Sequence, residues 1–125
     1  PEMLAVLPYE RDRAGLARAL ASADLYVAPF PMETFGLAAV EAMACGLPVV
    51  GVNSGAMADL LTGACWARLS RPGNATDFAR AVQDLLSQNL EALRADARKT
   101  AERYAWHRTF GDLFRAYHSL NSVSR

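Results

Sequence analysis

The sequence has 125 residues, a length typical of one domain with one core. Apolar residues make up 52% of it and charged residues 21%, a balance that excludes a disordered chain. Its 13 basic and 13 acidic residues give a net charge of zero, so no nucleic-acid partner is expected, because such partners usually require a basic excess.

Short apolar runs alternate with longer amphipathic segments, a pattern typical of an α/β domain with a Rossmann-like parallel sheet and flanking helices. The elements expected in the first half are a strand at Met3–Leu7, a helix at Asp12–Ala21, a strand at Leu25–Ala28, a helix at Phe35–Cys45, a strand at Val49–Val52 and a short helix from Gly55 to Leu61. Few polar residues interrupt the Phe35–Cys45 segment, so we expect a mostly buried helix with Thr34 as its N-cap and Gly46 as its left-handed C-cap. The unbroken apolar strand Val49–Val52 is expected to be covered on both faces.

The second half is expected to be largely helical. Its predicted elements are an edge strand at Trp66–Leu69 and helices from Thr76 or Asp77 to Ser87, at Leu90–Tyr104 and at Thr109–Leu120. The first of these helices is predicted to direct Phe78, Val82, Leu85 and Leu86 into the core. An apolar stripe on the last helix has helical spacing and is predicted to be packed; it consists of Trp106, Phe110, Leu113, Phe114 and Tyr117.

The segment from Pro29 to Gly46 is the best candidate for a functional site. It leaves the carboxyl end of a predicted strand and opens a helix, and ligands of open parallel sheets bind at such ends. Gly36, placed in the first helical turn, would let an anionic ligand approach the free N–H groups there. Glu33 and Glu41 lie eight residues apart, about 12 Å along a helix, comparable to the separation of sugar and ribose in a nucleotide sugar. Each carboxylate could accept hydrogen bonds from hydroxyl groups while the helix N-terminus holds the phosphates.

The charges are unevenly placed, which limits how a phosphate could be bound. Residues 1–62 carry three basic and seven acidic side chains. A phosphate site in this half would therefore depend on backbone N–H groups, helix dipoles or residues outside the chain.

Simpler interpretations of these residues stay open. Glu41 could be a solvent-facing helix carboxylate, Glu33 could only favour the helix dipole, and Gly36 could only relieve crowding against a strand.

The cysteines and histidines give no signal for a metal or a nucleophile. Cys45 and Cys65 lack metal-ligand spacing and are interpreted as small buried apolar groups, while His107 and His118 are interpreted as structural. The low cysteine count, the lack of an apolar run of about 20 residues and the lack of a signal-peptide pattern favour a reducing, cytoplasmic setting.

The Glu33-x7-Glu41 pattern, in the context ETFGLAAVEAMACGLPVV, resembles the E-x7-E motif of retaining GT-B glycosyltransferases of group 1 (family 4). Four further segments are similar to that family in the same order: DRAGLARALASADLYVAPFP, the Gly55–Leu61 loop and helix, RPGNATDFARAVQDLL and YAWHRTFGDLFRAYHSL. Nearly the whole chain takes part in the resemblance. The Gly55–Leu61 segment departs from the family's GGxPE pattern, since Ala56, Ala58 and Asp59 replace its second Gly, its Pro and its Glu.

The resemblance implies a transfer of sugar from a nucleoside diphosphate to an acceptor hydroxyl, with retention at the anomeric carbon. Glu33 would contact the donor sugar and take part in catalysis, and Glu41 would bind the ribose hydroxyls. The backbone amides of Phe35, Gly36 and Leu37, next to Thr34, would face the sugar and the diphosphate. The nucleoside-diphosphate sugar would be a co-substrate, and neither a metal nor another cofactor is expected.

The resemblance also implies that residues 1–125 are part of a C-terminal donor-binding domain, without the N-terminal domain that binds the acceptor. The first residue, Pro1, is consistent with a piece of a longer chain. Such a piece is expected to be inactive alone and prone to self-association. The acceptor (a glycan, a lipid or a small molecule) and any peripheral membrane contact would belong to the other domain.

Two alternatives remain at this point. One is a non-catalytic remnant or binding module with the same fold, and the other is a GT-B relative with epimerase or phosphorylase chemistry. The nucleotide, the sugar and the acceptor cannot be identified from these residues.

Overall fold

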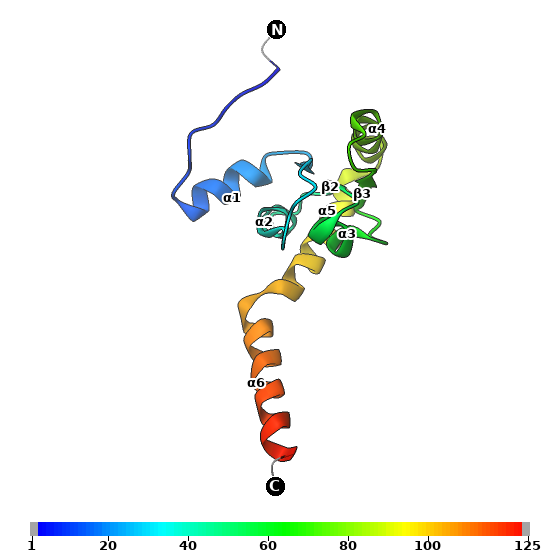
Figure 1. Cartoon of the computed structure of the whole chain (residues 1–125). Coiled ribbons are helices and arrows are strands. Elements are labelled where there is room, and N and C mark those ends of the chain that lie inside the picture. The colour runs from blue at the N-terminus through cyan, green and yellow to red at the C-terminus, as the bar shows by residue number, and fades with distance from the viewer. Residues whose placement is uncertain (1–2, 124–125) are drawn as a thin grey trace.

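The computed structural model describes the backbone of residues 3–123 and the side chains of residues 3–120, so Pro1 lies outside the described residues. Three parallel strands form a sheet in the order β1 (Tyr26–Ala28), β2 (Val49–Val52) and β3 (Ala67–Ser70). The helices are α1 (Arg13–Ala21), α2 (Leu37–Ala44), α3 (Gly55–Leu61), α4 (Ala75–Leu86), α5 (Leu90–Ala101) and α6 (Trp106–Val123), and a 3₁₀ turn, η1 (Glu102–Tyr104), precedes α6 (Figure 1). The predicted α/β class, with a parallel sheet and a helical C-terminal part, is confirmed.

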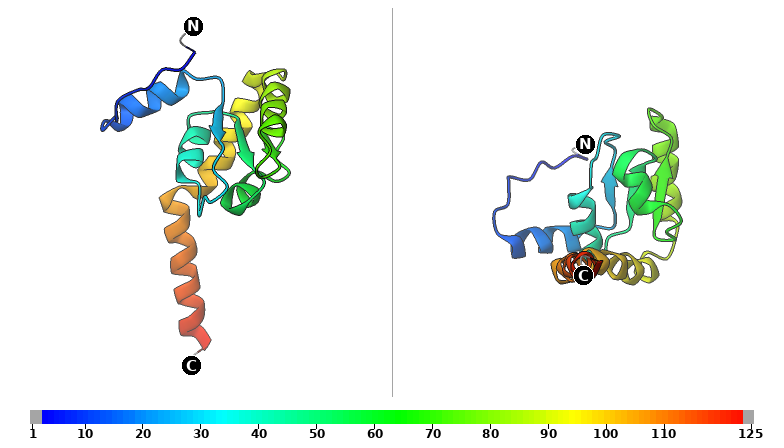
Figure 2. Two further views of the ribbon diagram at one scale, coloured as in Figure 1. Left: turned by 45° about the horizontal axis from the view of Figure 1, so that its top comes forward. Right: turned by 60° about the horizontal axis from the view of Figure 1, so that its bottom comes forward.

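The central strand β2 is covered on both faces, as its unbroken apolar sequence predicts. Successive side chains of a strand point to opposite faces, and here Val49 and Val50 are both fully buried. Val49 packs in a cluster with residues of α2 and α3, including Met43 and Met57. Val50 packs on the other face against Leu85 of α4. Figure 2 shows α2 and α4 on opposite sides of the sheet.

Helix α5 packs against α2. Its residues Ala97 and Ala101 are buried in the same cluster as Ala39, Val40 and Met43 of α2. Helix α2 therefore packs against both the sheet and α5. As predicted, Gly46 provides its left-handed C-cap, with a φ of +81°. The N–H groups of Gly46 and Leu47 donate to the carbonyls of Met43 and Ala42, the paired bonds of a Schellman C-cap.

Helix α4 begins one to two residues earlier than predicted because its N-cap is Asn74. The Asn74 side chain accepts a hydrogen bond from the Asp77 N–H at 2.9 Å. Leu85 is fully buried, as predicted, and Phe78 and Val82 are partly buried against the same cluster. The prediction is wrong for Leu86, which is 48% exposed because it lies on the side of α4 away from the sheet.

Asp77 links the loop before α4 to the helix and makes that link sensitive to acid. Its carboxylate accepts hydrogen bonds from the Arg71 N–H and guanidinium, and these bonds lower the pKa of Asp77. Because the folded pKa is the lower one, the stability contribution is complete above the ordinary carboxyl pKa, near 4, and is lost as the pH falls through the folded value. We expect Asp77→Asn to lower the melting temperature at pH 7, and the difference from the parent protein to disappear in acid. Thermal unfolding between pH 2 and 7 tests this, and a difference independent of pH would contradict it.

The predicted strand at Met3–Leu7 does not form. These residues are extended but pair with no described strand, and Met3, Leu4, Val6 and Leu7 are between 72% and 93% exposed. A strand is stabilised only by pairing, and this segment runs apart from the sheet (Figure 1). The apolar pattern was therefore insufficient to predict a strand.

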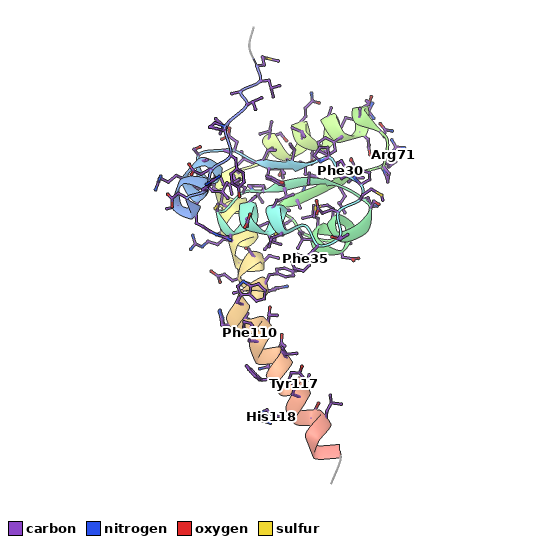
Figure 3. All side chains as sticks on the ribbon, turned by 60° about the vertical axis from the view of Figure 1, so that its left-hand side comes forward. Phe30, Phe35, Arg71, Phe110, Tyr117 and His118 are labelled. Carbon is purple, nitrogen blue, oxygen red and sulfur yellow. The ribbon has the colours of Figure 1, made fainter. Side chains whose placement is uncertain are left out.

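The predicted packing of the α6 stripe is also wrong within the part of the chain that the structure describes. Trp106 is 74% exposed, and Phe110, Leu113, Phe114 and Tyr117 are between 44% and 60% exposed. Figure 3 places Phe110, Tyr117 and His118 along a helix that extends away from the sheet. The stripe is amphipathic as the spacing predicts, but it covers no described element; its one ring contact is the stacking of Trp106 on Phe110 at 5.6 Å.

Candidate functional site

The loop between β1 and α2, residues 29–36, lies at the carboxyl end of the sheet, where ligands of open parallel sheets bind. The Glu33 carbonyl accepts a hydrogen bond from the N–H of Ala56, in the first turn of α3, at 3.0 Å. Gly55 makes this approach possible. Its φ is +54°, and a Cβ at this position would lie 2.8 Å from the Glu33 carbonyl oxygen. The backbone at Glu33 is thus fixed from the side of α3.

The N-cap of α2 is Gly36, which corrects the prediction of Thr34. Gly36 has a φ of +81°, and no side chain caps this helix end. Thr34 is exposed and lies two residues before the cap. A glycine is also required at position 36 because a Cβ there would lie only 2.2 Å from Cε of the buried Met57. Crowding against α3 rather than a strand, together with the positive φ, therefore explains this glycine.

The first turn of α2 offers N–H groups that no capping side chain occupies. The first amides of a helix have no partner within the helix and carry the positive end of its dipole. The amides of Gly36 and Leu37 belong to this end, next to Phe35. The Phe35 and Leu37 side chains are 55% and 61% exposed, and the Phe35 ring makes an edge contact with Tyr104 at 6.1 Å. Such an end can hold an anion.

Glu41 lies in the second turn of α2 and is partly buried. Its Oε1 accepts a hydrogen bond from Nη1 of Arg13, the first residue of α1, at 3.4 Å. The helical spacing assumed for Glu33 and Glu41 is wrong, because only residues from Leu37 onward are helical and residues 33–36 are a bent loop. The distance of about 12 Å therefore does not apply to this pair.

The pKa of Tyr26 in β1 is sensitive to both carboxylates. Burial raises the pKa of its hydroxyl, and the negative charges of Glu33 and Glu41 raise it further. Its side chain packs against the cluster that contains Ala39, Val40 and Met43 of α2. The charges of Glu33 and Glu41 thus act at one place beside α2. Sequence reasoning missed both Tyr26 and Arg13.

Three cavities include residues of this loop or of α2. One of about 290 Å³ lies between α2 and the α5–η1 segment and includes Glu41, Arg98 and Glu102. A second, of about 220 Å³, includes Thr34, Phe35 and Asp59. A third, of about 460 Å³, lies where the three strands end; its lining residues are Pro29, Val52, Ser70, Arg71, Gly73, Asn74, Ala75, Phe78 and Ala79. The surface around the β1–α2 loop is therefore hollowed rather than flat.

The remaining candidates do not assemble into a site. Cys45 is partly buried, whereas Cys65 is exposed and its Sγ donates to Asp96 Oδ2 at 3.7 Å, so the prediction of two buried cysteines is wrong for Cys65. His107 and His118 are exposed on α6. Among the described residues, no group of three or more His, Cys, Asp and Glu side chains could hold a metal ion. Within the same residues, no helix has the length and apolar character needed to cross a membrane.

Comparison with known proteins gives a consistent picture. Residues 5–88 match the family described as "Glycosyl transferases group 1". Over 100 residues the chain is 42% identical to a GDP-mannose-dependent alpha-(1-6)-phosphatidylinositol dimannoside mannosyltransferase of Mycobacterium tuberculosis (strain ATCC 25177 / H37Ra), covering 78% of the chain and 25% of that protein. It is 36% identical over 112 residues to a D-inositol 3-phosphate glycosyltransferase of Rhodococcus opacus (strain B4), covering 88% and 25%.

A solved structure extends the likeness to the fold. The chain resembles a sucrose-phosphate synthase from Thermosynechococcus elongatus with a TM-score of 0.76 and 28% identity, over 90% of the chain and 29% of that structure. The chain therefore spans about a quarter of the length of the curated relatives that it matches. The family match includes every element from α1 to α4 and thus the whole β1–α2 loop.

Proposed function

The chain belongs to the group 1 glycosyl transferases, and from this membership we propose that its β1–α2 segment binds the nucleotide-sugar donor of a retaining transfer reaction. The observation that carries the proposal is an uncapped helix N-terminus with a carboxylate on either side of it in the chain. No side chain caps α2, Glu33 lies in the loop before it, and Glu41 lies in its second turn. A donor of this kind has hydroxyl groups at both ends and a diphosphate between them.

The proposed roles follow from the chemistry of each group. Glu33 accepts hydrogen bonds from the hydroxyls of the donor sugar, and Glu41 accepts them from the ribose. The amides of Phe35, Gly36 and Leu37, beside Thr34, hold the diphosphate at the positive end of α2. No metal or other cofactor takes part in this proposal.

The transfer itself separates charge. The bond between the anomeric carbon and the diphosphate oxygen breaks, the acceptor oxygen bonds to the same face of that carbon, and the acceptor proton passes to the leaving diphosphate. Positive charge develops on the sugar and negative charge on the diphosphate, so Glu33 and the α2 amides stabilise the two separating charges.

We further propose that residues 1–125 supply the second part of a donor-binding domain and are inactive alone. The matched segment makes up 25% of the mannosyltransferase, so such relatives contain further chain that can provide the acceptor site, and positive charge for the diphosphate is scarce here. An acceptor hydroxyl must be held next to the anomeric carbon for transfer to proceed at a useful rate. The acceptor, whether a glycan, a lipid or a small molecule, would bind to that further chain.

Replacing Glu41 tests the donor site directly. We expect Glu41→Gln to raise the Kd for a nucleoside diphosphate about tenfold or more, because a hydrogen bond to a charged group contributes about 1.5–3 kcal/mol and 1.4 kcal/mol is tenfold. The turnover number should change less than the Kd. Calorimetric titration of the native polypeptide that contains these residues with GDP, UDP and ADP provides the measurement.

The control for this experiment is Glu102→Gln. Glu102 lines the same cavity as Glu41 but pairs with Arg98 at 4.0 Å and has no proposed contact with the donor. Its variant should bind the nucleotide like the parent protein. Equal Kd values for the Glu41 variant and the parent protein would contradict the ribose role.

A further inference from the structure

The contact between Arg13 and Glu41 joins two helices across 28 residues of sequence. Helix α1 begins at Arg13, directly after its N-cap Asp12, and packs beside α2. This end of α1 brings the Arg13 guanidinium to 3.4 Å from the Glu41 carboxylate. A basic side chain thus lies at the edge of the region proposed to hold the donor.

Stability gives little reason for this contact. The Arg13 side chain is 90% exposed, and ion pairs of such exposure contribute little to folding because water and salt screen them. Arg13 also occupies the first turn of α1, which holds no acidic residue, and a cation there opposes the helix dipole. A residue that is locally unfavourable and contributes little to stability indicates another role.

The local balance of charges indicates that this role is in binding an anionic ligand. Residues 1–62 contain three basic side chains, those of Arg11, Arg13 and Arg18, against seven acidic ones. Arg18 lies 3.7 Å from Asp12 on its own helix, whereas Arg13 contacts α2. The charges of Glu33 and Glu41 already act together at Tyr26, so an anionic ligand would be repelled there unless a cation offset them.

We infer that Arg13 is a positioning residue of the donor site, which neutralises Glu41 and holds its carboxylate in place for a nucleoside diphosphate. The inference rests on the proposed function. The guanidinium donates to one carboxylate oxygen, leaving the other free to accept from a ribose hydroxyl, and its positive charge lowers the repulsion of the diphosphate. Because most of its surface is exposed, its remaining N–H groups stay available to the ligand.

The test compares nucleotide affinity with thermal stability. In the native polypeptide, we expect Arg13→Ala to raise the Kd for the nucleoside diphosphate that binds best among GDP, UDP and ADP about tenfold, the effect of losing one charge-assisted contact. The melting temperature should stay unchanged. If the contact instead served to stabilise the fold, its loss would lower the melting temperature. Arg13→Lys should recover part of the affinity, since it restores the charge but not the planar fork.

The matched control is Arg18→Ala, on the same helix and 75% exposed. It removes one positive charge from α1 without removing a contact with α2, and it should leave the Kd unchanged. The inference is overturned if Arg13→Ala binds the nucleotide like the parent protein, or if the Arg18 variant loses as much affinity. A parent protein that binds none of the three nucleotides would instead refute the donor site itself, and the role of Arg13 with it.

Discussion

Replacing Glu33 with alanine is expected to reduce sugar transfer by the native polypeptide at least tenfold. Glu33 is held by the hydrogen bond from Ala56 to its carbonyl, so its backbone should keep its place when the side chain is shortened. The loss would then reflect the missing carboxylate beside the charge that develops on the sugar. Steady-state rates of transfer from a radiolabelled nucleotide sugar provide the measurement.

Donor affinity distinguishes this role from binding alone. If Glu33 acts mainly in the transition state, the turnover number should fall more than the Kd for the nucleoside diphosphate rises. Glu91→Ala is a suitable control, because the Glu91 side chain is 91% exposed at the start of α5 and lies 3.8 Å from Arg94. Near-normal turnover in the Glu33 variant would refute its catalytic role.

Replacing Gly55 with alanine is expected to reduce transfer about a hundredfold although Gly55 carries no functional group. A Cβ at Gly55 would lie 2.8 Å from the Glu33 carbonyl oxygen, which belongs to the backbone and cannot turn aside as a side chain can. The β1–α2 loop must therefore shift, and a misplacement of about 1 Å in an active site can cost a factor of 10² in rate. Transfer rates and melting temperatures measured together on the same variant test this.

A control variant at a second glycine distinguishes displacement of the β1–α2 loop from backbone strain. Gly63 also has a positive φ, +77°, but nothing lies within 4 Å of a Cβ built there. Gly63→Ala should therefore incur only the left-handed backbone cost, about 1–2 kcal/mol, and leave the transfer rate of the folded protein unchanged. Equal losses of activity in the two variants would show that loop displacement is not the cause.

The fold could be predicted for segments whose packing partners lie in the described part of the chain. Val49–Val52 is apolar throughout and becomes the central strand, buried on both faces. The segment Met3–Leu7 has the same apolar character but no neighbouring strand in the described chain, and it stays extended and exposed. Sequence pattern reports the tendency of a segment to pair, while pairing itself depends on what lies beside it.

For the candidate site, the order of its elements could be predicted but their geometry could not. The predicted order of strand, loop and helix in the β1–α2 segment is confirmed, whereas the helix was expected to begin near Thr34 and begins after Gly36. Helix propensity does not identify Gly36 as the cap. The requirement for a glycine there depends on Met57 of α3, which leaves no space for a Cβ. The roles assigned to Glu33 and Glu41 stay predictions until the variants are measured.

Arg13 and Tyr26 were missed for a related reason. Arg13 reaches Glu41 of α2 from a helix 28 residues away in the sequence, and Tyr26 lies on the strand β1. Neither residue belongs to a recognisable sequence motif. The signal for Arg13 was a basic residue in the first turn of a predicted helix, where acidic residues are favoured. A local exception of this kind can indicate a contact that only the folded chain reveals.

The packing of α2 against α5 has a consequence for synthesis on the ribosome. Helix α2 ends at Ala44, and the helix α5 that packs against it ends at Ala101, almost sixty residues later. At about 5–20 residues per second, roughly 3–11 s pass before that cover has been made. During this interval the apolar surface of Ala39, Val40 and Met43 has no α5 to shield it, so the nascent chain passes through a stage that chaperones can bind.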